Sequence, residues 1–73
     1  MATIAAMPWS TVESVFRQGY EAYQGKGPNA ECPFHLPGDK RIGVWVAGKD
    51  AARRRADRTT ALRAFIAREK QVM

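Results

Sequence analysis

A single cysteine, Cys32, is present among the 73 residues of this chain, so no disulfide can form within it. This scarcity fits a reducing compartment, and we expect the protein in the cytoplasm. No apolar run approaches the roughly 20 residues that a transmembrane helix needs. The first residues, MATIAAMPW, lack the basic start that is typical of a secretion signal. We therefore expect no membrane partner.

Residue types that bind metals or catalyse reactions are equally scarce. Cys32 and the one histidine, His35, lie close together, but a structural zinc site takes about four ligands. Residues 25–28, GKGP, lack the spacing of a phosphate-binding P-loop. We therefore expect no metal, no cofactor and no catalytic residue. The expected role of Cys32 is that of a small buried side chain, next to Pro33, that anchors its loop.

The positive charge of the chain is concentrated in its second half. The net charge is +5 at pH 7. Residues 1–31 hold two basic and three acidic side chains, a net charge of −1, whereas residues 32–73 hold ten basic and four acidic ones, a net charge of +6. Such asymmetry favours a polyanionic partner, with nucleic acid ahead of an acidic membrane surface.

A first helix is expected over about residues 10–24. Ser10 and Glu13 have the S-x-x-E spacing of a capping box, and apolar residues then recur at helical spacing. Gly19 lies on this apolar face, where a glycine allows a second helix to approach closely. Gly25 is the expected stop of the helix.

A connection without regular structure is expected over residues 25–38, which hold three glycines and three prolines. Its only large apolar side chains, Phe34 and Leu36, are expected to fold back over the helices. Residues 1–8 read as a flexible tail. Residues 9–73 then form one small domain.

A second helix is expected over about residues 39–57, with Asp39 as its N-cap and Gly48 opposite Gly19. A helical extension over about 59–71 carries the apolar residues Leu62, Phe65 and Ile66. These three are rotated around the axis from the apolar face of the second helix. Two alternatives follow: the helix bends or ends near residues 59–60, or this second patch binds a partner.

Arginines cluster around the end of the expected second helix, and arginine binds phosphate through paired hydrogen bonds. If Arg53, Arg54 and Arg55 lie on one helix, they spread over about 200° of its circumference, so at least two can face the same phosphate backbone. A solvated helical face is the alternative interpretation. The candidate RNA-binding residues are Arg41, Lys49, Arg53, Arg54, Arg55 and Arg58.

Three short motifs in order resemble the ribosome modulation factor family and its short relatives. They are G-Y-x-A in the first helix, C-P-F in the connection and W-V-x-G-x-x-x-A in the second helix, and they span about residues 16–56. Two positions depart from the family pattern: Gln18 replaces its arginine, and Lys49 replaces its second tryptophan. The matching residues are Gly19, Tyr20, Ala22, Cys32, Pro33, Phe34, Trp45, Gly48 and Ala52.

The resemblance implies an all-α protein, a two-helix antiparallel hairpin with a Gly/Pro-rich connection, to which this chain adds a basic C-terminal helical extension. It also implies binding to ribosomal RNA and small-subunit proteins, with an effect on ribosome activity or hibernation. One rival is a protein-interaction module that forms a homodimer or inhibits a larger protein through Leu62, Phe65 and Ile66. A second rival is a fluoroquinolone-modifying phosphotransferase, as a sister group is described, but the sequence shows no site for that chemistry.

Overall fold

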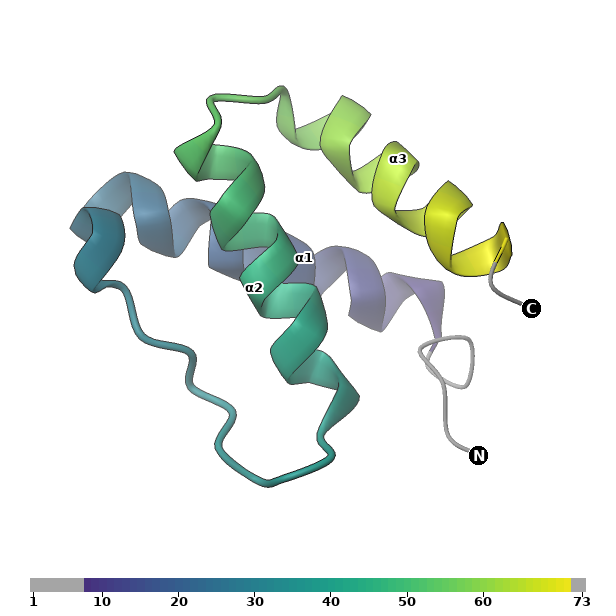
Figure 1. Ribbon diagram of the computed structural model, residues 1–73, viewed down its shortest axis with the longest axis horizontal. Helices are drawn as coiled ribbons and strands as arrows, with labels where there is room; N and C mark the ends of the chain where they lie inside the picture. Colours follow the sequence, from purple (N-terminus) through teal and green to yellow (C-terminus); the bar gives the residue numbers. More distant parts are fainter. Residues whose placement is uncertain (1–7, 72–73) are drawn as a thin grey trace.

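Three α-helices and one short 3₁₀ turn make up the computed structural model, which describes residues 8–71 (Figure 1). They are α1 (Trp9–Lys26), η2 (Gly27–Asn29), α2 (Lys40–Arg53) and α3 (Arg58–Gln71). No strand occurs among the described residues, so the all-α prediction is confirmed. Figure 1 shows α2 crossing α1, with α3 returning towards the side where α1 begins. The expected tail lies outside the described residues, except for Pro8.

The ends of α1 differ from the sequence prediction. The helix begins at Trp9, and the N-cap Pro8 makes no side-chain capping bond. The Pro8 carbonyl instead accepts hydrogen bonds from the amides of Thr11 and Val12. The predicted capping box is therefore wrong, because this earlier start places Ser10 inside the first turn. Gly25 is likewise inside the helix, and the stop is Gly27, whose φ of 65° suits glycine.

The crossing of α1 and α2 depends on two glycines that face each other. A Cβ atom on Gly19 would overlap the backbone carbonyl of Trp45, and one on Gly48 would overlap that of Phe16. Each glycine thus lets the backbone of the other helix approach to contact distance. The expected close approach at Gly19 and Gly48 is confirmed.

The core forms around this crossing, and α3 closes one side of it. The Phe65 ring packs against the Phe16 ring with 5.7 Å between centroids and planes inclined by 43°, an arrangement typical of favourable aromatic pairs. No buried polar side chain is present among the described residues. The buried apolar residues are Val12, Val15, Phe16, Ala30, Val44, Trp45, Ala51, Ala52 and Phe65.

A sharp turn separates α2 from α3, so the extension is a third helix and not a continuation. Arg55 has a φ of 59°, the left-handed conformation. The amide of Arg55 donates to the Ala52 carbonyl and that of Ala56 to the Ala51 carbonyl, both at 2.9 Å. These two bonds define a Schellman motif, a common way to end a helix. The predicted second helix is therefore four residues too long at its C-terminal end, since it stops at Arg53.

Aspartates begin both α2 and α3. Asp39 accepts a hydrogen bond from the Arg41 amide at 2.9 Å, which confirms the predicted N-cap. Asp57 accepts one from the Thr60 amide at 3.0 Å. The Tyr20 hydroxyl of α1 then fixes the turn from outside by donating to the Ala56 carbonyl at 2.7 Å.

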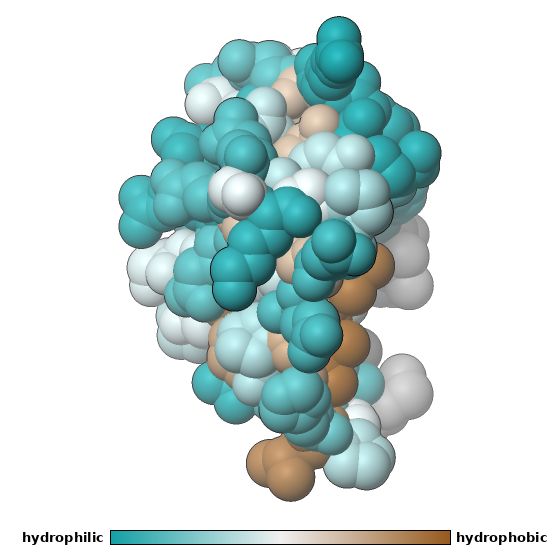
Figure 2. All heavy atoms as spheres, turned by 90° about the vertical axis from the view of Figure 1, so that its left-hand side faces the viewer, coloured by the Kyte–Doolittle hydropathy of each residue, from teal (hydrophilic) through white to brown (hydrophobic). Residues whose placement is uncertain are grey.

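The connection between η2 and α2 is held by two cations of α2. Lys49 Nζ donates to the carbonyls of Ala30 at 2.7 Å and Pro28 at 3.2 Å. Arg41 lies over the Phe34 ring, 4.3 Å from its centroid. Phe34 packs against the core as expected, but Leu36 is 71% exposed and does not fold back. Figure 2 views this side of the molecule: hydrophilic side chains cover most of it, and apolar ones gather in its lower half.

No helix among residues 8–71 is both long enough and apolar enough to cross a membrane.

Candidate nucleic-acid interface

Four arginines meet where α2 turns into α3, and we call Arg53, Arg54, Arg55 and Arg58 the arginine junction. Arg53 ends α2, Arg54 is its C-cap, Arg55 has the left-handed conformation and Arg58 begins α3. The expected fan on one continuous helix is wrong, because the helix stops before Arg54. The turn nevertheless gathers all four at one corner, with side chains of Arg53, Arg54 and Arg58 exposed by 60%, 57% and 44%.

Asp50 holds two of these arginines in place. Its carboxylate pairs with Arg53 at 2.6 Å and with Arg54 at 2.9 Å. These hydrogen bonds, with that from Arg53 foremost, lower the pKa of Asp50 below its ordinary value. Exposed ion pairs of this kind contribute about 0–1 kcal/mol each. A phosphate can therefore compete with Asp50 for the same guanidinium groups at little cost.

Arg58 and Arg55 complete the junction in different ways. Arg58 reaches back to Glu21 of α1, with 3.4 Å between nitrogen and oxygen. This pair offsets the unfavourable placement of a cation at a helix N-terminus. Arg55 is exposed and forms no ion pair with any of residues 8–71. It lies beyond the C-terminal end of α2, where the helix dipole favours a positive charge.

The other two predicted RNA-binding residues do not join the junction. Arg41 lies twelve positions before Arg53, near the other end of α2, about 18 Å away along the helix axis. There it pairs with Asp39 at 2.8 Å, which raises the pKa of Arg41 and lowers that of Asp39. Lys49 is half-buried, and its ammonium group binds connection carbonyls. Arg41 and Lys49 therefore lie outside the arginine junction, and their contact with RNA stays a prediction.

The motif residues behind the family resemblance serve mainly in packing. Gly19, Trp45 and Gly48 form the helix crossing. Tyr20 anchors the turn that carries the junction. The rest divide by burial: Ala52 is buried, Ala22, Cys32 and Phe34 are partly buried, and Pro33 is exposed.

The apolar residues of α3 face inward. Phe65 is only 8% exposed, and Leu62 and Ile66 are partly buried against the same core. Sequence reasoning treated these three as a possible docking face. That interpretation needs correction for Phe65. Because α3 turns back over α1, the Phe65 ring packs against Phe16 and is not available to a partner.

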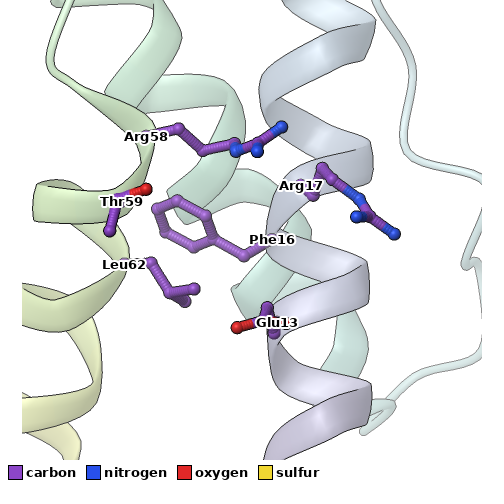
Figure 3. A pocket seen from close by; sticks show the side chains of 6 residues that line it. All are labelled: Glu13, Phe16, Arg17, Arg58, Thr59 and Leu62. Atoms are coloured by element: carbon purple, nitrogen blue, oxygen red, sulfur yellow. The ribbon is translucent and has the colours of Figure 1, made fainter.

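A small cavity of about 180 Å³ lies between α1 and α3 beside the junction. In Figure 3, Phe16 and Leu62 point into it, Arg58 extends across it towards α1, and the Arg17 guanidinium points away. Its volume is below the range of about 300–1,000 Å³ that is usual for ligand pockets. We interpret it as a packing gap at the edge of the α1–α3 contact.

The two acidic partners of the junction differ in how far the sequence reveals them. Asp50 was detectable, because it lies three and four positions before Arg53 and Arg54, the spacing of helical ion pairs. Glu21 was not detectable, since only the fold brings it near Arg58. Over the described residues, no group of three or more His, Cys, Asp or Glu side chains could hold a metal ion.

Comparisons with protein-family models, with curated proteins and with solved structures gave no match for this chain.

Proposed function

We propose that this protein binds RNA through the arginine junction, with ribosomal RNA and small-subunit proteins as its partners. The observation that carries the proposal is the gathering of four exposed arginines at one turn fixed by backbone hydrogen bonds. Arginine suits this role because its planar group binds phosphate through paired hydrogen bonds and also stacks on exposed bases.

The rigidity of the turn supports the proposal. Arg55 and Ala56 are tied to the last turn of α2, and Tyr20 ties the turn to α1. Side chains on a fixed backbone lose less conformational freedom on binding than those on a loose loop, so more of the interaction energy remains as affinity.

The local acids set the expected strength of binding. Asp50, Asp57 and Glu21 lie among the four arginines and reduce the net charge of this corner. We therefore expect affinity that depends strongly on salt and that needs a dense array of phosphates, as in a ribosome. The cytoplasmic location expected from the single cysteine belongs to this proposal, as does the antiparallel two-helix hairpin with its Gly/Pro-rich connection. It assigns the protein no enzymatic activity.

Co-sedimentation with small ribosomal subunits tests the proposal. Arg53→Gln/Arg54→Gln removes two junction charges, and Arg63→Gln/Arg68→Gln removes two charges from exposed positions on α3. We expect the junction variant to bind about tenfold more weakly, since phosphate contacts are lost. The α3 variant should change binding much less.

Two results would contradict the proposal. Equal weakening by both variants would show that binding follows net charge and not the junction. Absence of the wild-type protein from the subunit fraction at low salt would remove the ribosome as its target.

A further inference from the structure

A shallow groove of about 360 Å³ runs along α2 directly beside the arginine junction. We call it the α2 groove. Its lining residues are Ala30, Cys32, Trp45, Val46, Lys49, Asp50 and Arg53.

The α2 groove is apolar in its interior and carries net positive charge at its rim, where two cations, Lys49 and Arg53, lie with one anion, Asp50. Val46 is 48% exposed, although it is a large apolar residue on a small protein. Cys32 is partly buried beside it, and Trp45 contributes little surface because it is 3% exposed. The Lys49 ammonium lies 5.8 Å from the centre of the Trp45 ring and keeps positive charge at the wall. Figure 2 shows small apolar areas between hydrophilic side chains on the connection side of the molecule.

Arg53 belongs to both the α2 groove and the arginine junction. The Asp50 carboxylate accepts hydrogen bonds from Nε and from one terminal nitrogen of Arg53, at 3.1 and 2.6 Å. The remaining N–H groups of the guanidinium are left for another acceptor. A ligand with a planar apolar part and an adjoining phosphate can therefore occupy the groove and reach Arg53 at the same time.

We infer that the α2 groove receives an unstacked base of single-stranded RNA while the neighbouring phosphates bind the arginine junction. This inference rests on the proposed function and adds the form of RNA that is recognised. Bases of an RNA duplex are paired and stacked, so they cannot enter a groove beside the backbone, whereas loops and single strands can turn bases outward. The cationic rim favours this occupant over an apolar protein side chain, which would gain nothing from Arg53 or Lys49.

Cys32 provides the test, because it is the only cysteine of the chain and lines the groove. The rate of its alkylation by iodoacetamide is measured on the full-length protein. A single-stranded RNA of mixed sequence, at saturation judged by fluorescence anisotropy, should slow alkylation several-fold. A duplex of the same sequence and inorganic polyphosphate, each at the same occupancy, should leave the rate near that of the free protein.

A matched pair of variants gives a second readout. Val46→Ser should weaken binding of the single strand but not of the duplex, because it removes an apolar contact only for an inserted base. Leu36→Ser, at a more exposed apolar position outside the groove, should change neither.

Each other outcome has a defined meaning. Equal protection of Cys32 by the duplex, or no protection at saturating single strand, would overturn the inference and leave the proposed function standing. Failure of every RNA to bind would overturn both. Protection by a short leucine-containing peptide, with none from bound RNA, would assign the groove to a protein ligand and refute the inference.

Discussion

At the scale of single residues, Arg55 has an unfavourable backbone conformation that places its side chain at the junction. A left-handed conformation is unfavourable for any residue with a Cβ atom, and helices usually place glycine there. Here arginine occupies this position, just after the C-cap of α2, with its side chain exposed. The same residue keeps a cation at the corner where the other three junction arginines lie.

The cost of that conformation can be measured by replacing Arg55. We expect Arg55→Gly to be more stable than Arg55→Ala by about 1 kcal/mol in the free energy of unfolding, since both lose the charge but only glycine tolerates the positive φ. Urea denaturation followed by circular dichroism measures the difference. Equal stability of the two variants would show that residue 55 does not have the left-handed conformation in solution.

At the scale of elements, the close approach of the α1 and α2 backbones at their crossing sets the arrangement of the three helices. Gly19 and Gly48 allow α1 and α2 to touch, which brings Trp45 and Phe16 into one core and leaves α3 to cover it. A third helical glycine, Gly43, has open space around its Cβ position and takes no part in the crossing. Alanine substitutions at these three positions can therefore distinguish the destabilisation caused by a steric clash from the stabilisation that alanine gives any helix.

Alanine substitutions test the crossing. Gly19→Ala and Gly48→Ala should each destabilise the protein by about 1–3 kcal/mol or more, because a methyl group would overlap a backbone carbonyl of the other helix. Gly43→Ala should instead stabilise it by up to about 1 kcal/mol through helix propensity. Thermal or chemical unfolding gives all three values. A gain in stability at Gly19 or Gly48 would contradict the close approach.

The start of α3 predicts a dependence on acid. The amide of Thr60, bonded to Asp57, lowers the pKa of that carboxyl below its ordinary value of 3.8. A carboxyl with a lowered folded-state pKa stabilises the fold above its unfolded pKa, and this stability is lost as the pH falls through the folded value. We therefore expect the melting temperature to decrease when the pH is lowered below about 4. In Asp57→Asn, the decrease in melting temperature over the same pH range should be smaller. An unchanged acid dependence in the variant would contradict the cap.

Helix interiors were easier to predict from the sequence than helix ends. Apolar spacing located α1, and the two glycines indicated the crossing, because both signals are local or repeat along one face. The start of α1, next to Ser10, and the end of α2, near Arg55, were not predicted correctly. Both depend on backbone bonds that no residue type requires, and the second is reinforced by the hydrogen bond from Tyr20 to Ala56, two residues that lie 36 positions apart in sequence. The arginine run was visible for the same local reason, whereas the roles of Lys49 and Glu21 needed the fold.

As a whole molecule, the protein combines a thin core with four arginines gathered at one corner. A chain of this length buries only about 60% of the surface that it exposes when unfolded, and here α3 completes the core by packing Phe65 on Phe16. The same turn that sends α3 back over α1 creates the arginine junction. Folding and the proposed RNA binding thus depend on one corner of the structure, with the α2 groove beside it.

The salt dependence of RNA binding tests this account most directly. The logarithm of the association constant for a single-stranded RNA is plotted against the logarithm of salt concentration, for the wild type and for Arg53→Gln/Arg54→Gln. Four arginine–phosphate contacts predict a slope of about −2.8 for the wild type, and the variant, which loses two of them, should be shallower by about 1.4. A flat wild-type plot, or the same slope in both proteins, would contradict the arginine junction as the RNA-binding surface.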